Sequence, residues 1–118
     1  MTVKNLDLMR CVTPMKLLCD KDNIPFLAAV SISKNVSAID NAIEEYLKKK
    51  DELNRKYLTN EGATPTVKAG FEEEYLRLIT ELNNDTVNIP IEAIDINALA
   101  NITFPPKFIQ CIEFMLDI

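Results

Sequence analysis

The sequence contains no histidine and no tryptophan, and only two glycines and three cysteines among its 118 residues. The absence of histidine removes the commonest general base, the commonest metal ligand and every Ser–His or Cys–His nucleophile pair. Two glycines are too few for a turn-rich β-sandwich or barrel, and neither sits in the spacing of a phosphate-binding loop. We therefore identify no catalytic residue, no cofactor site and no metal site in this sequence.

The three cysteines, Cys11, Cys19 and Cys111, are an odd number without regular spacing. They form neither the pattern of a disulfide framework nor the closely spaced pairs of a structural zinc site. Residues 1–20 show no signal-peptide pattern, and the longest apolar run, residues 24–30, is far shorter than the ~20 residues that span a bilayer. We expect a soluble protein that is not secreted and stays in a reducing cytoplasm.

The charge balance and the size limit the partners and the fold. The formal net charge is −5 and the pI about 4.7, so long-range attraction to DNA or anionic lipid is poor. We expect neither nucleic-acid binding nor membrane binding. Hydrophobic residues at 47% and charged residues at 26% are ordinary globular values. A chain of this length is most simply a single domain, residues 1–118, with one modest core.

One stretch, residues 24–57, dominates the hydrophobic pattern. At alternating steps of 4 and 3 residues it carries Ile32, Val36, Ile39, Ile43, Tyr46, Lys50, Leu53 and Tyr57. This spacing places them along one narrow stripe of an α-helix, as in a coiled coil. We predict one long helix of about 34 residues and about 50 Å. Its apolar first part, residues 26–32, is expected to be the most deeply buried, and the weak helix formers from Ser31 to Ser37 are the expected place of a bend.

Shorter elements flank this helix. Residues 5–19 are predicted to be helical, with Asn5 as the N-cap and an interruption at Pro14, because proline removes a backbone donor. Residues 59–66 are predicted to be an exposed loop, and residues 67–82 a second helix that folds back antiparallel over the stripe. The predicted buried face of that helix comprises Val67, Phe71, Tyr75, Leu78 and Leu82, widened by Leu76 and Ile79.

At residues 87–91 the hydrophobic period changes from helical to alternating, which predicts a short edge strand. Residues 1–3 are its only candidate partner within the chain. A C-terminal amphipathic helix is predicted over residues 106–117. The predicted fold class is therefore mainly α (α+β with a minimal two-stranded β element), in which the long central helix is packed by two or three shorter helices.

The second helix, about 16 residues and about 24 Å long, is much shorter than the first. Part of the stripe is therefore expected to stay uncovered. The candidate partner-binding residues on it are Ile39, Ile43, Tyr46, Lys50, Leu53 and Tyr57. A second copy of the chain, giving a homodimer, is the simplest cover, and another protein is the alternative. This pattern favours a non-enzymatic protein that acts by self-association or by binding another protein.

Two other function classes stay open. The acidic run at residues 72–74, with Glu44 or Glu45, could form a carboxylate metal site or serve a small enzyme. Adjacent carboxylates near a helix start are more often simply solvated. The basic residues between positions 48 and 56 could serve a nucleic-acid-associated regulator, although the interleaved Asp51 and Glu52 favour an ordinary solvated helix surface.

The order of elements resembles small uncharacterised helical proteins of bacteriophages and prophages. The resemblance is carried by Asp22-Asn23-Ile24-Pro25, the helix over residues 34–57, Phe71-Glu72-Glu73-Glu74, Val87-Asn88-Ile89-Pro90-Ile91 and Ile112-Glu113-Phe114-Met115. The likeness spans most of the chain. It implies a phage-type accessory protein in the cytoplasm of the bacterial host cell, and it brings no catalytic residue with it.

Overall fold

The computed structural model describes residues 1–59 and 64–117. Its elements in chain order are β1 (Thr2–Lys4), α1 (Asn5–Cys19), α2 (Phe26–Tyr57), β2 (Leu58–Thr59), β3 (Thr66–Val67), α3 (Glu72–Asn84), β4 (Thr86–Asn88), β5 (Ile94–Asp95), the 3-10 helix η1 (Ile96–Leu99), α4 (Pro106–Ile112), the 3-10 helix η2 (Glu113–Met115) and β6 (Leu116–Asp117). The predicted fold class, mainly α with a long helix packed by shorter ones, is confirmed. Instead of one strand pair, the described residues contain three short pairs.

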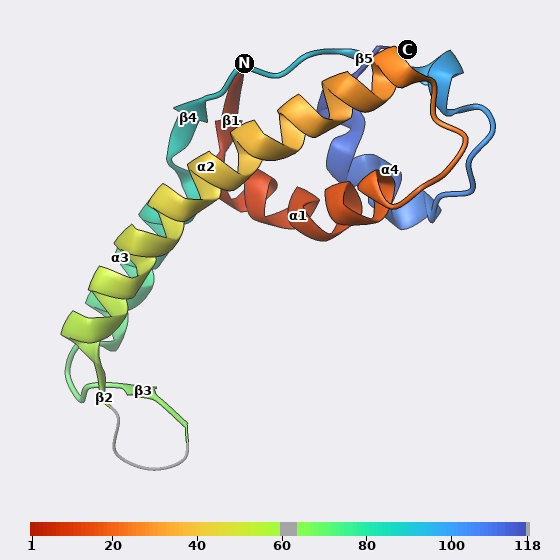
Figure 1. Ribbon diagram of the computed structural model, residues 1–118. Helices are drawn as coiled ribbons and strands as arrows, with labels where there is room; N and C mark the ends of the chain where they lie inside the picture. The colour runs from red at the N-terminus through yellow and green to blue at the C-terminus, as the bar shows by residue number, and fades with distance from the viewer. Residues whose placement is uncertain (60–63, 118) are drawn as a thin grey trace.

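The long helix α2 joins two parts of the molecule (Figure 1). Its first half lies with β1, α1, β4, β5, η1, α4, η2 and β6 in a rounded part, here called the head. Its second half lies beside α3 in a projecting part, here called the arm (residues 44–59 and 64–84). The molecule measures 53 × 29 × 20 Å and its radius of gyration is 17.4 Å. A compact chain of this length would have a radius of gyration of about 13.5 Å, so the molecule is elongated.

α2 is a single helix of 32 residues, close to the predicted length. Its exposed charges pair along the arm: the Lys48 ammonium lies 3.9 Å from Glu44 and 3.7 Å from Glu45, and Arg55 lies 2.8 Å from Asp51. Pairs three and four residues apart stabilise a helix that protrudes into solvent, each by about 0.2–0.5 kcal/mol.

Residues 31–37, the expected place of a bend, are an uninterrupted part of α2. Asn35 in their middle is fully buried. Its Nδ2 donates to the Glu92 carbonyl oxygen and its Oδ1 accepts from the Glu92 N–H, each at 2.8 Å. This side-chain amide satisfies the backbone of the segment between β4 and β5 as a neighbouring strand would. Packing and hydrogen bonds thus outweigh the weak helix propensity of this stretch.

Two predictions for the first helix are wrong. α1 runs from Asn5 to Cys19 without interruption, with Pro14 inside it. Pro14 is buried, and α1 packs against both α2 and α4, so packing outweighs the lost backbone hydrogen bond. Asn5 does not cap the helix. Its buried side chain instead donates to the Leu82 carbonyl oxygen of α3 at 2.9 Å.

Two of the three strand pairs lie in the head, and the third lies at the end of the arm. β1 pairs antiparallel with β4, which confirms the expected pairing of the N-terminal strand with the segment after α3. β5 and β6 pair in parallel, so the predicted C-terminal helix stops at Ile112 and gives way to η2 and β6. β2 and β3 pair antiparallel at the two ends of the expected loop at residues 59–66, of which residues 60–63 lie outside the described residues.

The hydrophobic core lies in the head. Its fully buried aliphatic side chains include Leu8, Met15, Leu18, Ile32, Ile39, Ile94, Ile112 and Met115. The start of α2, expected to be the most deeply buried segment, is instead open to solvent: Phe26 is 79% and Leu27 80% exposed. Ile32, one to two turns further on, is buried. Continuous apolar composition therefore did not indicate burial, because the described elements leave the first turn of α2 uncovered.

Candidate functional site

The structure places most of the candidate partner-binding residues inside the molecule. Ile39, Ile43, Tyr46 and Tyr57 are 1%, 8%, 5% and 3% exposed. Lys50 and Leu53 are half-buried. The expectation that part of this stripe stays open is wrong for these four buried residues, because α1 covers the part of α2 in the head while α3 covers the part in the arm. The stripe is the internal seam of the molecule.

Hydrogen bonds from tyrosines hold the two helices of the arm together. All three tyrosines of the protein lie there. Tyr46 donates to Asn83, Tyr57 donates to Glu74 at 2.8 Å, and Tyr75 donates to Asn54 at 2.6 Å. Burial, with a smaller contribution from Tyr75, raises the pKa of the Tyr46 hydroxyl above its ordinary value of 10.0. The arm seam is therefore polar as well as aromatic.

One side of the arm exposes apolar side chains. The hydrogen bond between Tyr75 and Asn54 marks this side on both helices. Leu47 lies two turns before Asn54 on α2, and Ile79 lies four residues after Tyr75 and three after Leu76 on α3, so helical periodicity gathers them there. Leu76 is 66% and Leu47 46% exposed. We call this surface the flank, defined by Leu47, Lys50, Asn54, Tyr75, Leu76 and Ile79.

The opposite side of the arm is charged. Periodicity places Glu45 and Lys49 of α2 and Glu81 of α3 there, and all three are exposed. Glu81 pairs with Arg77 at 3.3 Å. The two sides of the arm thus differ in chemistry, and the flank is the apolar one.

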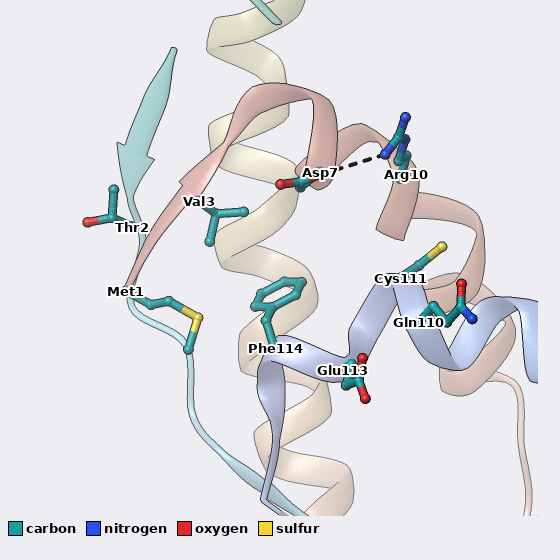
Figure 2. A pocket seen from close by; sticks show the side chains of 9 residues that line it. All are labelled: Met1, Thr2, Val3, Asp7, Arg10, Gln110, Cys111, Glu113 and Phe114. Atoms are coloured by element: carbon teal, nitrogen blue, oxygen red, sulfur yellow. Dashed lines mark ion pairs between the residues drawn. The ribbon is translucent and has the colours of Figure 1, made fainter. Parts of the chain in front are cut away.

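A hollow of about 870 Å³ lies in the head between β1, the start of α1, α4 and η2. Its lining residues are Met1, Thr2, Val3, Asp7, Arg10, Gln110, Cys111, Glu113 and Phe114. Figure 2 shows the side chains of Met1, Val3 and Phe114 converging between β1 and η2, while β4 lies on the other side of β1. The hollow is a broad depression open to solvent, with both polar and apolar atoms on its surface.

Charged groups stand at the rim of the hollow. Asp7 and Arg10 lie 3.9 Å apart, with side chains 51% and 64% exposed. Glu113, also exposed, has no ion pair among the described residues. With the Met1 ammonium, the lining of the hollow therefore holds two carboxylates and two cationic groups.

The acidic run and the Cys11 thiol take part in local hydrogen bonding and packing. The described residues contain no group of three or more Cys, Asp and Glu side chains that could hold a metal ion. In the acidic run at residues 72–74, Glu72 accepts from the Gly70 N–H and Glu74 from Tyr57. Burial raises the pKa of the Cys11 thiol to about 11, so it stays protonated. No described helix is both long and apolar enough to cross a membrane.

Comparison with known proteins gives no relative: the chain matches no family model, no curated protein sequence and no solved structure. The flank and the hollow are therefore known from the structure of this chain alone.

The sequence pattern did not single out either surface. Leu47 follows Tyr46 directly and falls just off the stripe, whereas Leu76 was expected to widen the buried face of α3 and is instead exposed. The alternation of leucine with charged residues along both arm helices is a signal that could have pointed to the flank. The hollow joins residues from the two ends of the chain, and no local pattern indicates it.

Proposed function

We propose that this protein is a non-enzymatic accessory protein of the phage-encoded type, working in the cytoplasm of the bacterial host cell by protein–protein contact through the flank. The observation that carries the proposal is the exposure of Leu76 and Leu47 on one side of a projecting helix pair. Gathered apolar side chains on a surface mark interaction sites, whereas single ones do not. The long helix remains the interacting element, but the contact lies beside its buried stripe.

The partner that we propose for the flank is a second copy of the chain. Two antiparallel helix pairs packed face to face form a four-helix bundle, and a two-fold axis lets one surface cover itself. Lys50 supports this choice because it is half-buried at the flank and has no ion pair among the described residues. Around a two-fold axis near this position, Lys50 would share the Asp51 carboxylate of the second copy with Arg55, which lies 2.8 Å from Asp51 within each copy.

The size of the flank sets the expected strength of the dimer. α3 has 13 residues, so a face built from two helices measures about 20 Å by about 20 Å, or about 400 Å² per copy. Two such faces bury about 800 Å², less than the ~1,200 Å² at the lower end of stable interfaces. The expected dimer is weak and reversible, and it forms at high protein concentration.

Light scattering and sedimentation equilibrium from about 10 µM to about 1 mM test self-association. The mean mass of the unsubstituted protein should rise toward that of a dimer. Leu76→Glu should keep the monomer mass throughout, because it puts a charge at the centre of the contact. Lys49→Glu, on the charged side of the arm, is the matched control and should still associate. A monomer at every concentration contradicts the dimer.

A phage or host protein bound by the same flank is tested separately by affinity capture from phage-infected bacteria. A partner of the flank should be captured by the unsubstituted chain and by Lys49→Glu, and should be lost with Leu76→Glu. Equal capture by all three chains would place the contact elsewhere.

A further inference from the structure

A separate cavity of about 260 Å³, here called the pocket, opens in the head between η1 and α4 and shares no lining residue with the hollow. One wall is η1 with the chain that follows it, the other is α4, and α1 and β6 contribute one leucine each. In Figure 1 the segment between β5 and α4 lies at the end of the head away from the arm. The lining includes Leu18, Ile96, Ile102, Phe104, Ile109 and Ile112.

The pocket reaches from the surface to the core. Leu18 and Ile112 belong to the core and are 0% and 1% exposed. Ile96 and Ile109 are 42% and 41% exposed and stand at the mouth. The lining therefore has a buried inner end and an open outer end, as a molecule that enters lengthwise requires.

Contacts on both sides hold the walls apart. β5 and β6 pair in parallel, with Ile94 opposite Leu116, so the chain before η1 is fixed to the chain after η2. The Phe104 ring packs edge-on against Phe108 of α4, with 6.2 Å between their centroids. The Ile102 N–H donates to the Leu99 carbonyl at 3.3 Å, which turns the chain between these two contacts. The pocket is thus formed before any ligand enters, as small-molecule sites usually are.

The chemistry of the pocket is uniform. None of the described side chains that line it carries a nitrogen, an oxygen or a charge. A polar group placed at the inner end would lose its hydrogen bonds to water and find no side-chain partner. Water inside is itself poorly held by such walls, and an apolar group that displaces it gains affinity. The pocket therefore selects hydrocarbon.

We propose that the pocket binds the alkyl chain of a small uncharged molecule, whose polar end stays in water at the mouth beside Ile96 and Ile109. A cavity of about 150 Å³ with aliphatic and aromatic walls holds the six carbons of benzene. By the same ratio, 260 Å³ holds about ten carbons.

A protein segment suits this site less well than a small molecule. Its peptide groups would need hydrogen-bond partners at the mouth, where protein interfaces carry a polar rim and this mouth carries two isoleucines. The pocket lies in the head and does not involve the flank. Ligand binding is therefore independent of the proposed self-association, and either can fail without the other.

The test uses the full chain titrated with 1-butanol, 1-hexanol and 1-octanol and followed by amide and methyl NMR. The signals of Ile102, Ile109 and Leu116 should shift, and those of Leu76 and Ile79 in the arm should stay in place. Affinity should rise about fourfold for each added CH₂ that is buried. Absence of shifts at the pocket, or equal shifts in the arm, overturns the proposal.

A second ligand tests the direction of entry without any change to the protein. 1,6-Hexanediol has the same chain as 1-hexanol but a hydroxyl at both ends, so one hydroxyl must enter the apolar inner end. It should bind about tenfold more weakly than 1-hexanol. Equal affinity of the two alcohols contradicts a buried alkyl end.

Ile109→Glu tests the mouth. The residue is 41% exposed, so the fold should tolerate the substitution, while the carboxylate removes the apolar entrance. Affinity for 1-hexanol should fall about tenfold. Gln110→Glu, which adds the same charge one residue further along α4 and outside the lining of the pocket, is the matched control and should bind as the unsubstituted protein does. Equal affinity of the two variants places the ligand elsewhere.

Ile102→Phe tests whether the pocket limits chain length. The larger ring occupies part of the pocket, so 1-octanol should lose more affinity than 1-butanol. Ile102→Leu keeps the side-chain volume and should leave both affinities unchanged. An equal loss for the short and the long alcohol would contradict binding within the pocket.

Discussion

The head and the arm share one helix but are held together by different interactions. In the head, aliphatic side chains such as Leu8, Ile39 and Ile112 are at most 1% exposed and pack from several elements. In the arm only two helices meet; its buried residues are Leu82 and two tyrosines, Tyr46 and Tyr57, which each use a hydroxyl to bond the opposite helix. The head is thus stabilised mainly by apolar burial, whereas the arm combines apolar burial with directed hydrogen bonds along one seam.

This difference indicates how the arm stays folded. A helix pair of this length is marginal alone in water, because helix nucleation is costly and two helices bury little surface. The arm gains its order because α2 continues into it from the head, and because Asn5 of α1 bonds the end of α3. We expect the arm to open locally at a lower free energy than the head.

Ile39→Ala in the head should have the largest effect. Truncation of a fully buried isoleucine costs about 2–5 kcal/mol, a large share of the roughly 5–15 kcal/mol that stabilises a domain. Urea denaturation followed by far-UV circular dichroism measures the loss. The chain has no tryptophan and all its tyrosines lie in the arm, so tyrosine fluorescence reports on the arm alone. If the fluorescence transition keeps its midpoint in this variant, the arm does not depend on the head.

Asn35→Leu should have the next largest effect on stability. It removes both hydrogen bonds to the backbone of Glu92, each worth about 0.5–1.5 kcal/mol. The Glu92 amide should also lose its protection in hydrogen exchange. Lys34→Ala, which removes only the exposed ion pair with the Glu92 carboxylate, is the control and should leave that protection in place.

Tyr75→Phe should affect the arm and spare the head. It removes one hydrogen bond to Asn54, worth about 1 kcal/mol. Hydrogen exchange should become faster in α3 while the amides of α1 keep their rates. A double-mutant cycle with Asn54→Ala isolates the pair, because the second substitution should cost little once the hydroxyl is absent. An equal acceleration in α1 would show that the two parts open as one unit.

The thiols report on the head, where all three cysteines lie. Cys19 is exposed and should react with a thiol reagent, whereas Cys11 should react only on unfolding. Burial raises the pKa of Cys11 from 9.0 to about 11, so the folded state binds its proton more tightly. The resulting stability is present below pH 9 and is lost between pH 9 and about 11. Cys11→Ala should lack this component of the pH dependence, and an unchanged profile would contradict it.

The smallest expected effect is at the surface of the head. Hydrogen bonds from Ser31 and Lys34 lower the pKa of Glu92 below its ordinary 4.5. Its ionised form therefore stabilises the fold above that pH, and this contribution is lost as the pH falls through the lowered pKa. Carboxyl NMR titration should show the pKa of Glu92 rising in Lys34→Met. No rise would mean that the ion pair contributes nothing.

Periodicity predicted the direction of side chains along α2 correctly. Ile32, Ile39, Ile43 and Tyr46 all face inward at the predicted spacing. The same pattern could not tell which element covers them, because burial of a stripe is decided by segments distant in sequence. The length of α3 was given most weight and the N-terminal helix α1 too little, so partner-binding residues were predicted on what is an internal seam.

Buried polar residues were the other source of error. Asn5 was expected at a helix start and Asn35 in a weak stretch, yet both side chains bond backbone groups about sixty to eighty residues away. The apolar composition of residues 26–32 also gave a wrong prediction of burial for Phe26 and Leu27. Composition alone does not tell which other segment packs against a stretch of chain. The hollow depends on contacts between the two ends of the chain and has no local signature.

Because α2 is one continuous helix, a small rotation in the head produces a larger displacement at the end of the arm. The 32 residues of α2 extend about 48 Å, so a tilt of about 5° at the head would move the far end by about 4 Å. That displacement is close to the ~4.8 Å between neighbouring strands. A small change in how α1 packs against α2 would therefore produce a larger displacement at the C-terminal end of α2. A partner bound at that end would be displaced with it.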